Sequence, residues 1–150
     1  MQRYPTPDMD ELAGVLDRRA EALIIDGLLV AVVVGALGYL VGTAVVGGSL
    51  GGLGVLFLTL EFGVPIVFLV YQAAFEGYYG QTLGKRARGI VVVKDDGSQC
   101  TWGAAIVRNL LRVVDMLPVF YIVGIVSAHL TDDHQRVGDF AASTVVVQAE

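Results

Sequence analysis

Two long runs of apolar residues occupy the first half of the chain and predict two membrane-spanning helices. The first run lies within residues 18–42 and the second within residues 50–72. Each is close to the roughly 20 residues that a helix needs to cross the hydrocarbon of a bilayer. The residues between the runs include glycines and hydroxyl side chains but no charge. We therefore expect a two-helix transmembrane hairpin, in which Gly38 and Gly42 suit close helix contact.

Two carboxylates interrupt these apolar runs. Asp26 lies within the first run and Glu61 near the middle of the second. A charge inside hydrocarbon costs roughly 2.5–3.5 kcal/mol on insertion scales, so each needs a partner, water or a function. Both are candidate ion or proton sites, although a protonated Glu61 bonded to a neighbouring helix explains that residue equally well. Arg19 and Ala22 share a helix face with Asp26 because of their 3-then-4 spacing.

A third apolar region, residues 102–130, is too interrupted for a simple membrane span. Its first part, residues 102–115, has the pattern of an amphipathic helix. Three ionisable residues share one face of that helix at a 4-then-3 spacing, namely Arg108, Arg112 and Asp115. This stripe lies in water at the membrane surface or turns toward the spanning helices; the pattern allows both. Pro118 breaks the helix, and residues 119–130 alone are too few to cross. We expect a third, broken or re-entrant helical segment.

Two short runs of β-branched residues predict strands outside the membrane. Residues 90–93 precede the turn sequence Asp95-Asp96-Gly97, and residues 144–147 form the second run. An isolated strand leaves its backbone unpaired, so we expect the two to pair on one side of the membrane. The alternative is a full third span that places the C-terminus outside, which the scarcity of basic residues after Arg112 mildly favours.

Together these elements predict an all-α integral membrane protein with a small two-stranded β element on the cytoplasmic side. We expect a single domain over residues 1–150. Its segments are an N-terminal tail or interfacial helix (1–17), two spanning helices (18–42 and 50–72), a basic loop and strand (76–101), the broken helical segment (102–130) and a C-terminal loop and strand (131–150).

Composition and charge support this assignment. Hydrophobic residues make up 55% and charged residues 17% of the 150 residues, against about 45–50% and 25% in soluble domains. The net charge of −5 argues against a nucleic-acid partner. Basic residues gather at or before Arg19 and between Lys85 and Arg112, with only Arg136 beyond. This distribution predicts a multi-pass protein of the plasma membrane with a cytoplasmic N-terminus.

Catalytic, metal and cofactor chemistry find little support in the sequence. A single cysteine, Cys100, excludes a disulfide within the chain. No combination of serine, cysteine and histidine suggests a nucleophile, so we do not expect an enzyme. His129 and His134 lack metal-ligand neighbours at helical spacing, and we interpret them as interface residues. Residues 80–86 differ from a phosphate-binding loop, because the glycine spacing is one residue short and Arg86 replaces Ser or Thr.

The motifs resemble those of the RDD family, membrane proteins named for an arginine and two aspartates. Four blocks carry the resemblance: Arg19-x-x-Ala22-x-x-Ile25-Asp26; Gly80-Gln81-Thr82-Leu83-Gly84-Lys85-Arg86 with Gly89-Ile90-x-Val92; Arg108-Asn109-Leu110-Leu111-Arg112-x-x-Asp115-x-Leu117-Pro118; and Gln135-Arg136-x-Gly138-Asp139-x-x-Ala142-x-Thr144-x-Val146. The resemblance implies that Arg19 begins the first helix, that Asp26 lies within it, and that Asp139, or less favourably Asp115, is the second aspartate. It also implies a link to transport, since sodium/proton antiport is attributed to one member. Glu61 is not part of the family pattern.

Two function hypotheses follow. In the first, the chain is an ion- or proton-coupled transporter for Na⁺ or H⁺ that works as a homo-oligomer in the bilayer, because two helices cannot enclose a pathway. In the second, it is a non-transporting accessory or scaffold protein, and the arginines and aspartates form a structural ion network. In either case Arg19 and Asp26, about 10 Å apart along a helix, reach separate partners. We expect Asp26 to meet Arg108, Arg112 or Arg136, and Arg19 to meet Asp115 or Asp139.

Overall fold

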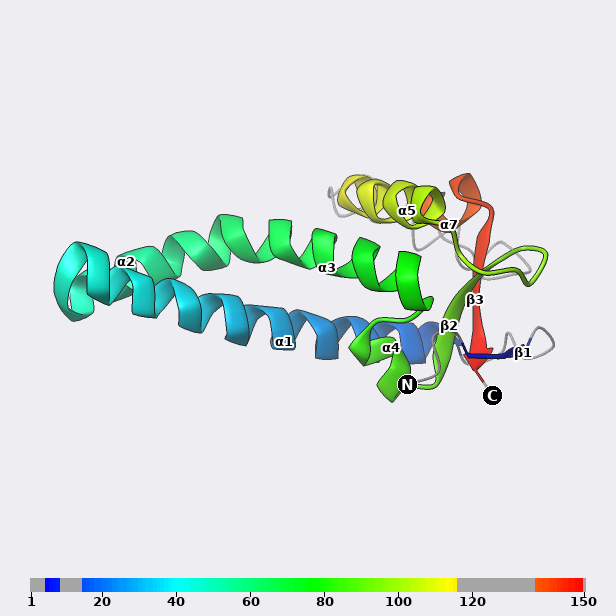
Figure 1. The fold of residues 1–150 in the computed structure, drawn as a ribbon, viewed down its shortest axis with the longest axis horizontal. Helices are drawn as coiled ribbons and strands as arrows, with labels where there is room; N and C mark the ends of the chain where they lie inside the picture. The colour runs from blue at the N-terminus through cyan, green and yellow to red at the C-terminus, as the bar shows by residue number, and fades with distance from the viewer. Residues whose placement is uncertain (1–4, 9–14, 116–136, 150) are drawn as a thin grey trace.

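A computed structural model describes residues 5–8, 15–115 and 137–149. A long pair of helices extends to one side, and three strands and three shorter helices gather at the opposite end (Figure 1). We call this second part the cap. The predicted segment 119–130 and the residues Arg136, His129 and His134 lie outside the described residues, as does the side chain of Asp115.

The helix pair forms from one continuous helical run that folds back on itself. Helix α1 (Val15–Gly42) leads through the π-helical turn η1 (Thr43–Gly47) to a reversal at Gly47 and Gly48, whose φ angles are +98° and +67°. These positive angles favour glycine, so the reversal is encoded locally. Helix α2 (Gly48–Leu58), the π-helical turn η2 (Thr59–Gly63) and helix α3 (Val64–Tyr79) then return alongside α1 (Figure 1).

Glycines set the close approach of the two arms. A Cβ atom on Gly42 would lie 2.6 Å from the carbonyl oxygen of Gly51, and one on Gly38 would meet the side chain of Thr59. Small residues therefore allow the two backbones to approach closely, a feature that is common where membrane helices pack together. The connection between the two arms is short, because the residues are helical up to Gly47 and again from Gly48.

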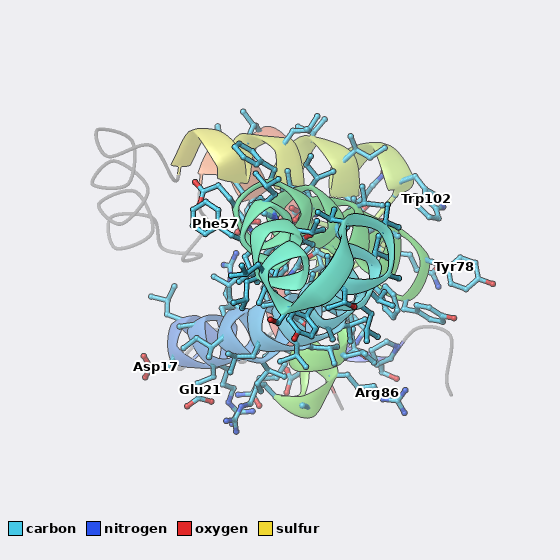
Figure 2. All side chains as sticks on the ribbon, turned by 90° about the vertical axis from the view of Figure 1, so that its left-hand side faces the viewer. Asp17, Glu21, Phe57, Tyr78, Arg86 and Trp102 are labelled. Carbon is cyan, nitrogen blue, oxygen red and sulfur yellow. The ribbon has the colours of Figure 1, made fainter. Side chains whose placement is uncertain are left out.

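The outer surface of the helix pair is apolar. Side chains such as Phe57 project outward when the pair is seen end-on (Figure 2). Leu28, Val32 and Ile66 are each more than 60% exposed. Within the described residues, one helical run, Val15–Tyr79, is long and apolar enough to cross a membrane, with a mean hydropathy of 2.4 in its most apolar window. Only 22% of that window is buried within the protein, so its apolar surface faces outward.

The cap contains an antiparallel sheet with the order β1-β3-β2. Strand β2 (Ile90–Lys94) pairs with β3 (Thr144–Ala149), with Val92 opposite Val146. This confirms the predicted pairing of the two β-branched runs. The expectation of only two strands is wrong, since β1 (Pro7–Asp8) adds to the free edge of β3. The sequence does not reveal β1, because a strand of two residues is too short to show an alternation of apolar and polar residues. Its proline is tolerated because β1 lies at the edge of the sheet.

Three helices complete the described part of the cap. They are α4 (Leu83–Ala87), α5 (Trp102–Asp115) and α7 (Val137–Ala141). The range of α5 confirms the predicted helix at 102–115. Helix α4 was expected to be loop, and α3 runs beyond residue 72 to Tyr79. The core between α1, the sheet and α5 comprises Val15, Ala22, Ile90, Val92, Cys100, Ala105 and Val146.

Candidate functional site: two buried carboxylate clusters

Asp26 lies in α1 at the level of α4 and is fully buried. Four donors reach its two carboxylate oxygens. Tyr71 Oη and the backbone amide of Gly84 donate to Oδ1 over 2.8 and 2.7 Å. Thr82 Oγ1 and Gln72 Nε2 donate to Oδ2 over 2.5 and 3.2 Å. We call Asp26 and these four residues the Asp26 site.

The local sequence around α4 builds half of this site. Gly80 ends α3 in the left-handed conformation with φ +69°, and Thr82 caps α4 by accepting a hydrogen bond from the amide of Lys85. The first amides of a helix lack intrahelical partners, and Gly84 uses its amide on the carboxylate. A Cβ atom on Gly84 would collide with the carbonyl oxygen of Ala22 and the carboxylate of Asp26. Glycine is therefore needed for α4 to approach α1.

The prediction that Asp26 meets an arginine is wrong for Arg108, which pairs elsewhere. The prediction rested on charge alone, whereas two residues at the start of α4 and two of α3 supply neutral donors instead. Hydrogen bonds to a carboxylate stabilise its charged form without a counter-ion. Asp26 therefore needs no cation.

A second group of charged residues joins five helices at the junction of the helix pair and the cap. Arg19 of α1 pairs with Asp139 of α7. Arg108 of α5 bridges the two carboxylates, with its Nη2 at 2.9 Å from Asp139 Oδ1 and its Nε at 3.3 Å from Glu76 Oε2. Lys85 of α4 pairs with Glu76 of α3. We call these five residues the ionic cluster; each is no more than 7% exposed.

The pairing of Arg19 with Asp139 confirms one of the two partners expected for Arg19. The contact joins residues 120 positions apart, and it follows from the family pattern, not from local sequence. Gly138 lets α7 lie close to α5, since a Cβ there would be 2.8 Å from the carbonyl oxygen of Arg108. That close approach places Asp139 between Arg19 and Arg108.

Burial and charge shift the pKa values of the cluster in opposite ways. Burial alone would raise the pKa of Asp139, but the charges of Arg108 and Arg19 hold it well below its usual value. Burial lowers the pKa of Lys85 to about 7, although the nearby Glu76 carboxylate opposes that shift. Asp139 is thus fixed in its charged form at neutral pH, whereas Lys85 gains and loses its proton near pH 7.

Sequence reasoning missed Glu76 and Lys85, which complete the ionic cluster, and Tyr71, Gln72 and Thr82, which surround Asp26. One signal was present in the sequence. Gln72 and Glu76 are one helical turn apart in an otherwise apolar helix, and such a pair shares a face. Asn109, next to Arg108, also reaches this face and donates from Nδ2 to Glu76 Oε2 over 2.9 Å.

Two other residues that the sequence suggested as site residues, Glu61 and Arg112, lie outside the two clusters. Glu61 lies in η2, exposed on the side of the helix pair and away from both sites. Arg112 lies beside the ionic cluster, and its buried Nη1 has no hydrogen-bond partner among the described residues.

The described residues offer no group of three or more His, Cys, Asp or Glu side chains that could hold a metal. Burial raises the pKa of the Cys100 thiol, so this cysteine is not a ready nucleophile.

Comparison with known proteins supplies the context for this geometry. The model of the RDD family matches residues 13–143. A similar curated protein is the "Uncharacterized membrane protein YteJ" of Bacillus subtilis (strain 168), which is 39% identical over 85 residues. The match covers 55% of this chain and 49% of that protein, so the chain spans about half the length of the curated relative it matches. No solved structure matches the chain.

Proposed function

The chain belongs to the RDD family of membrane proteins, and we propose that it is a non-transporting accessory protein of the membrane. In this proposal the helix pair is a transmembrane hairpin, and the Asp26 site and the ionic cluster hold the cap rigidly against its cytoplasmic end. The cap then serves as a membrane-anchored scaffold.

The observation that carries this proposal is the saturation of Asp26. A carboxylate has about four lone-pair positions, two on each oxygen, and Asp26 receives two donors on each oxygen. A transported Na⁺ would need those oxygens as ligands, and a transported proton would compete with four hydrogen bonds. The site therefore suits a fixed contact better than a stage in a transport cycle.

The placement in the membrane rests on length, hydropathy and charge. Helix α1 has 28 residues, or roughly 42 Å at 1.5 Å per residue, which exceeds the roughly 30 Å of hydrocarbon. Arg18, Arg86 and Arg88 are exposed at the cap end of the pair, where they mark the cytoplasmic side. The surface beyond them toward α2 is apolar and carries the exposed Glu61.

The test measures transport and protein abundance together. Purified full chain in liposomes is expected to move no Na⁺ or H⁺ above the leak of empty liposomes. In cells, Asp26→Asn is expected to lower the amount of protein in the membrane, and Glu61→Gln serves as the matched control with unchanged abundance. A flux that Asp26→Asn abolishes while abundance stays at the wild-type level would overturn the proposal.

A proton-coupled transporter working as a homo-oligomer is the second candidate, and one observation favours it. Lys85 is buried beside Glu76 and has a pKa of about 7, so it can exchange a proton at physiological pH. In this candidate Glu61 faces a second copy of the chain and continues the proton path. Proton flux lost in both Lys85→Met and Glu61→Gln would support it; flux that both variants retain would exclude these residues as carriers.

A further inference from the structure

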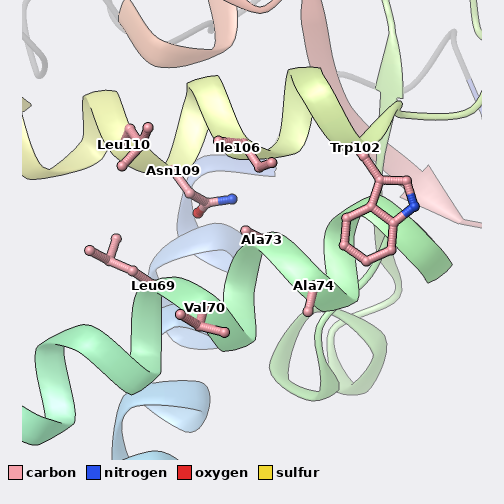
Figure 3. Close-up of a pocket in the computed structure, with 8 residues that line it drawn as sticks. All are labelled: Leu69, Val70, Ala73, Ala74, Trp102, Ile106, Asn109 and Leu110. Atoms are coloured by element: carbon pink, nitrogen blue, oxygen red, sulfur yellow. The ribbon is translucent and has the colours of Figure 1, made fainter.

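An apolar groove lies between α3 and α5, outside both carboxylate sites. Four residues of each helix line it (Figure 3), and its volume is about 330 Å³. This is near the lower end of the range for small-molecule sites, roughly 300–1,000 Å³. Ala73 and Ala74 form its floor on α3, and their small side chains leave the space that larger residues would fill.

The groove opens onto the apolar surface of the helix pair. Its rims are formed by exposed side chains of both helices, with Val70 of α3 64% exposed and Leu110 of α5 58% exposed. In water such rims would be unfavourable. If the hairpin spans the bilayer, as proposed above, the groove opens toward the hydrocarbon layer.

Asn109 is the one side-chain amide in the lining, and its donors are already paired. Asn109 donates its two amide hydrogens to Glu76 Oε2 and to the carbonyl oxygen of Ala105, over 2.9 and 2.8 Å. These two acceptors fix the orientation of the amide group, and Oδ1 is buried from solvent. The lining is therefore almost entirely apolar, and the accessible donor among its side chains is the indole N–H of Trp102 at one end, so the groove suits a hydrocarbon chain better than a polar headgroup.

Trp102 closes the groove at the end near the cap. Its indole packs on Gly77, where a Cβ atom would lie 2.9 Å from Trp102 Cε3. Tryptophan is typical of the boundary between hydrocarbon and headgroups, so the groove runs from that boundary into the apolar layer. A whole helix does not fit inside, because a cylinder of 10 Å diameter and 12 Å length has roughly 900 Å³.

We propose that this groove binds one hydrocarbon chain of a membrane phospholipid, with its headgroup beyond Trp102. The proposal rests on the membrane placement of the hairpin. It assigns α5 a second role, because the helix that carries Arg108 into the ionic cluster also holds a lipid against α3. The bound chain fills space that the protein leaves between the hairpin and the cap.

The chain contains a single tryptophan, so Trp102 fluorescence reports directly on the groove. The full chain is reconstituted in vesicles of phosphatidylcholine brominated in the acyl chain, since bromine quenches indole on contact. Ala73→Phe and, as a milder variant, Ala74→Leu fill the groove. Ala36→Phe adds the same bulk as Ala73→Phe to an exposed position of α1 and is the control.

Trp102 is 52% exposed and also meets bulk lipid, so filling the groove is expected to remove part of the quenching and leave the rest. Ala36→Phe should match the wild type, and circular dichroism checks that each variant is folded. Equal quenching in all four proteins would overturn the lipid site while leaving the membrane placement intact. Stronger quenching in the filled variants would also overturn it, because it would mean that a second copy had occupied the groove. No quenching in any protein would overturn both proposals.

Discussion

The Asp26 site and the ionic cluster both bury carboxylates at the junction of hairpin and cap, but they stabilise them differently. Asp26 is surrounded by neutral donors, two hydroxyls, one side-chain amide and one backbone amide. Glu76 and Asp139 are surrounded by cations, with Arg108 shared between them. Asp26 is therefore stabilised by neutral hydrogen-bond donors, whereas Glu76 and Asp139 are stabilised by opposite charges.

The two sites also connect different elements of the fold. The donors of the Asp26 site come from residues 71–84, so this site fixes α1 against the end of α3 and the start of α4. The ionic cluster instead brings in α5 and α7, and it closes only when the late part of the chain is in place. The first site joins elements 45 to 58 positions apart, and the second adds the late helix α7, whose Asp139 is 120 positions from Arg19.

The largest expected effect comes from removing the shared cation. Arg108→Met leaves Glu76 and Asp139 buried with fewer counter-charges, which is expected to cost about 3–5 kcal/mol in the free energy of unfolding. Chemical denaturation in detergent micelles would measure it. Arg88→Met is the control, because its exposed pair with Glu21 contributes about 0.2–1 kcal/mol at most. Equal losses in the two variants would contradict the shared role of Arg108.

A smaller loss is expected when the Asp26 site loses its charge but keeps its shape. Asp26→Asn should cost about 1.5–3 kcal/mol, the usual contribution of hydrogen bonds to a charged group. The buried Oε1 of Gln72 has no partner among the described residues and can turn to accept from the new amide. The same denaturation experiment compares this variant with Arg108→Met; a larger loss for Asp26→Asn would reverse the ranking of the two sites.

The two sites should also differ in their response to pH. Because burial lowers the pKa of Lys85 to about 7, the unfolded chain binds more protons than the folded one between pH 7 and 10. Stability then rises with pH, by about 1 kcal/mol between pH 7 and 8. Lys85→Met should remove this rise, while Thr82→Val in the Asp26 site should keep it. A wild-type stability that is flat or falling over this interval would show that Lys85 keeps its charge when folded.

The smallest effect is expected at Glu61, which lies outside both sites. Glu61→Gln should change the free energy of unfolding by less than about 0.5 kcal/mol, as for surface positions elsewhere. Thermal unfolding in micelles, with wild type measured in parallel, is the check. A loss as large as that of Asp26→Asn would place Glu61 in a buried contact, such as one between copies of the chain.

The sequence was sufficient to predict a helix or strand wherever a pattern of apolar or β-branched residues continues over several residues. The long apolar runs predicted α1 and the return arm, and the amphipathic pattern of residues 102–115 predicted α5 with the correct bounds. The β-branched runs were enough to predict the pairing of β2 with β3. Strand β1 and helix α4 were missed because each is too short to show a period.

The carboxylate sites were less predictable for a different reason. Charge indicated that Asp26 needed partners, but the neutral residues that supply them, Tyr71, Gln72 and Thr82, carry no such signal. Arg19 and Asp139 were matched through the family motif, because no local rule connects residues 120 positions apart. The i, i+4 spacing of Gln72 and Glu76 indicated that both side chains share one face of a helix. It could not show that Glu76 is buried, because its burial depends on the tertiary position of α5.

The separation of Arg19 and Asp139 also orders the events of biosynthesis. While the chain is being made, Asp26 gains the last of its four donors as soon as Gly84 has left the ribosome. Arg19 then waits without Asp139 until nearly all of the remaining chain has been translated. Strand β3, which follows at once and pairs with both β2 and the early residues Pro7 and Asp8, completes the cap in the same step. A chain that stops before residue 139 therefore contains every residue of the Asp26 site but lacks the carboxylate that pairs with Arg19 and Arg108.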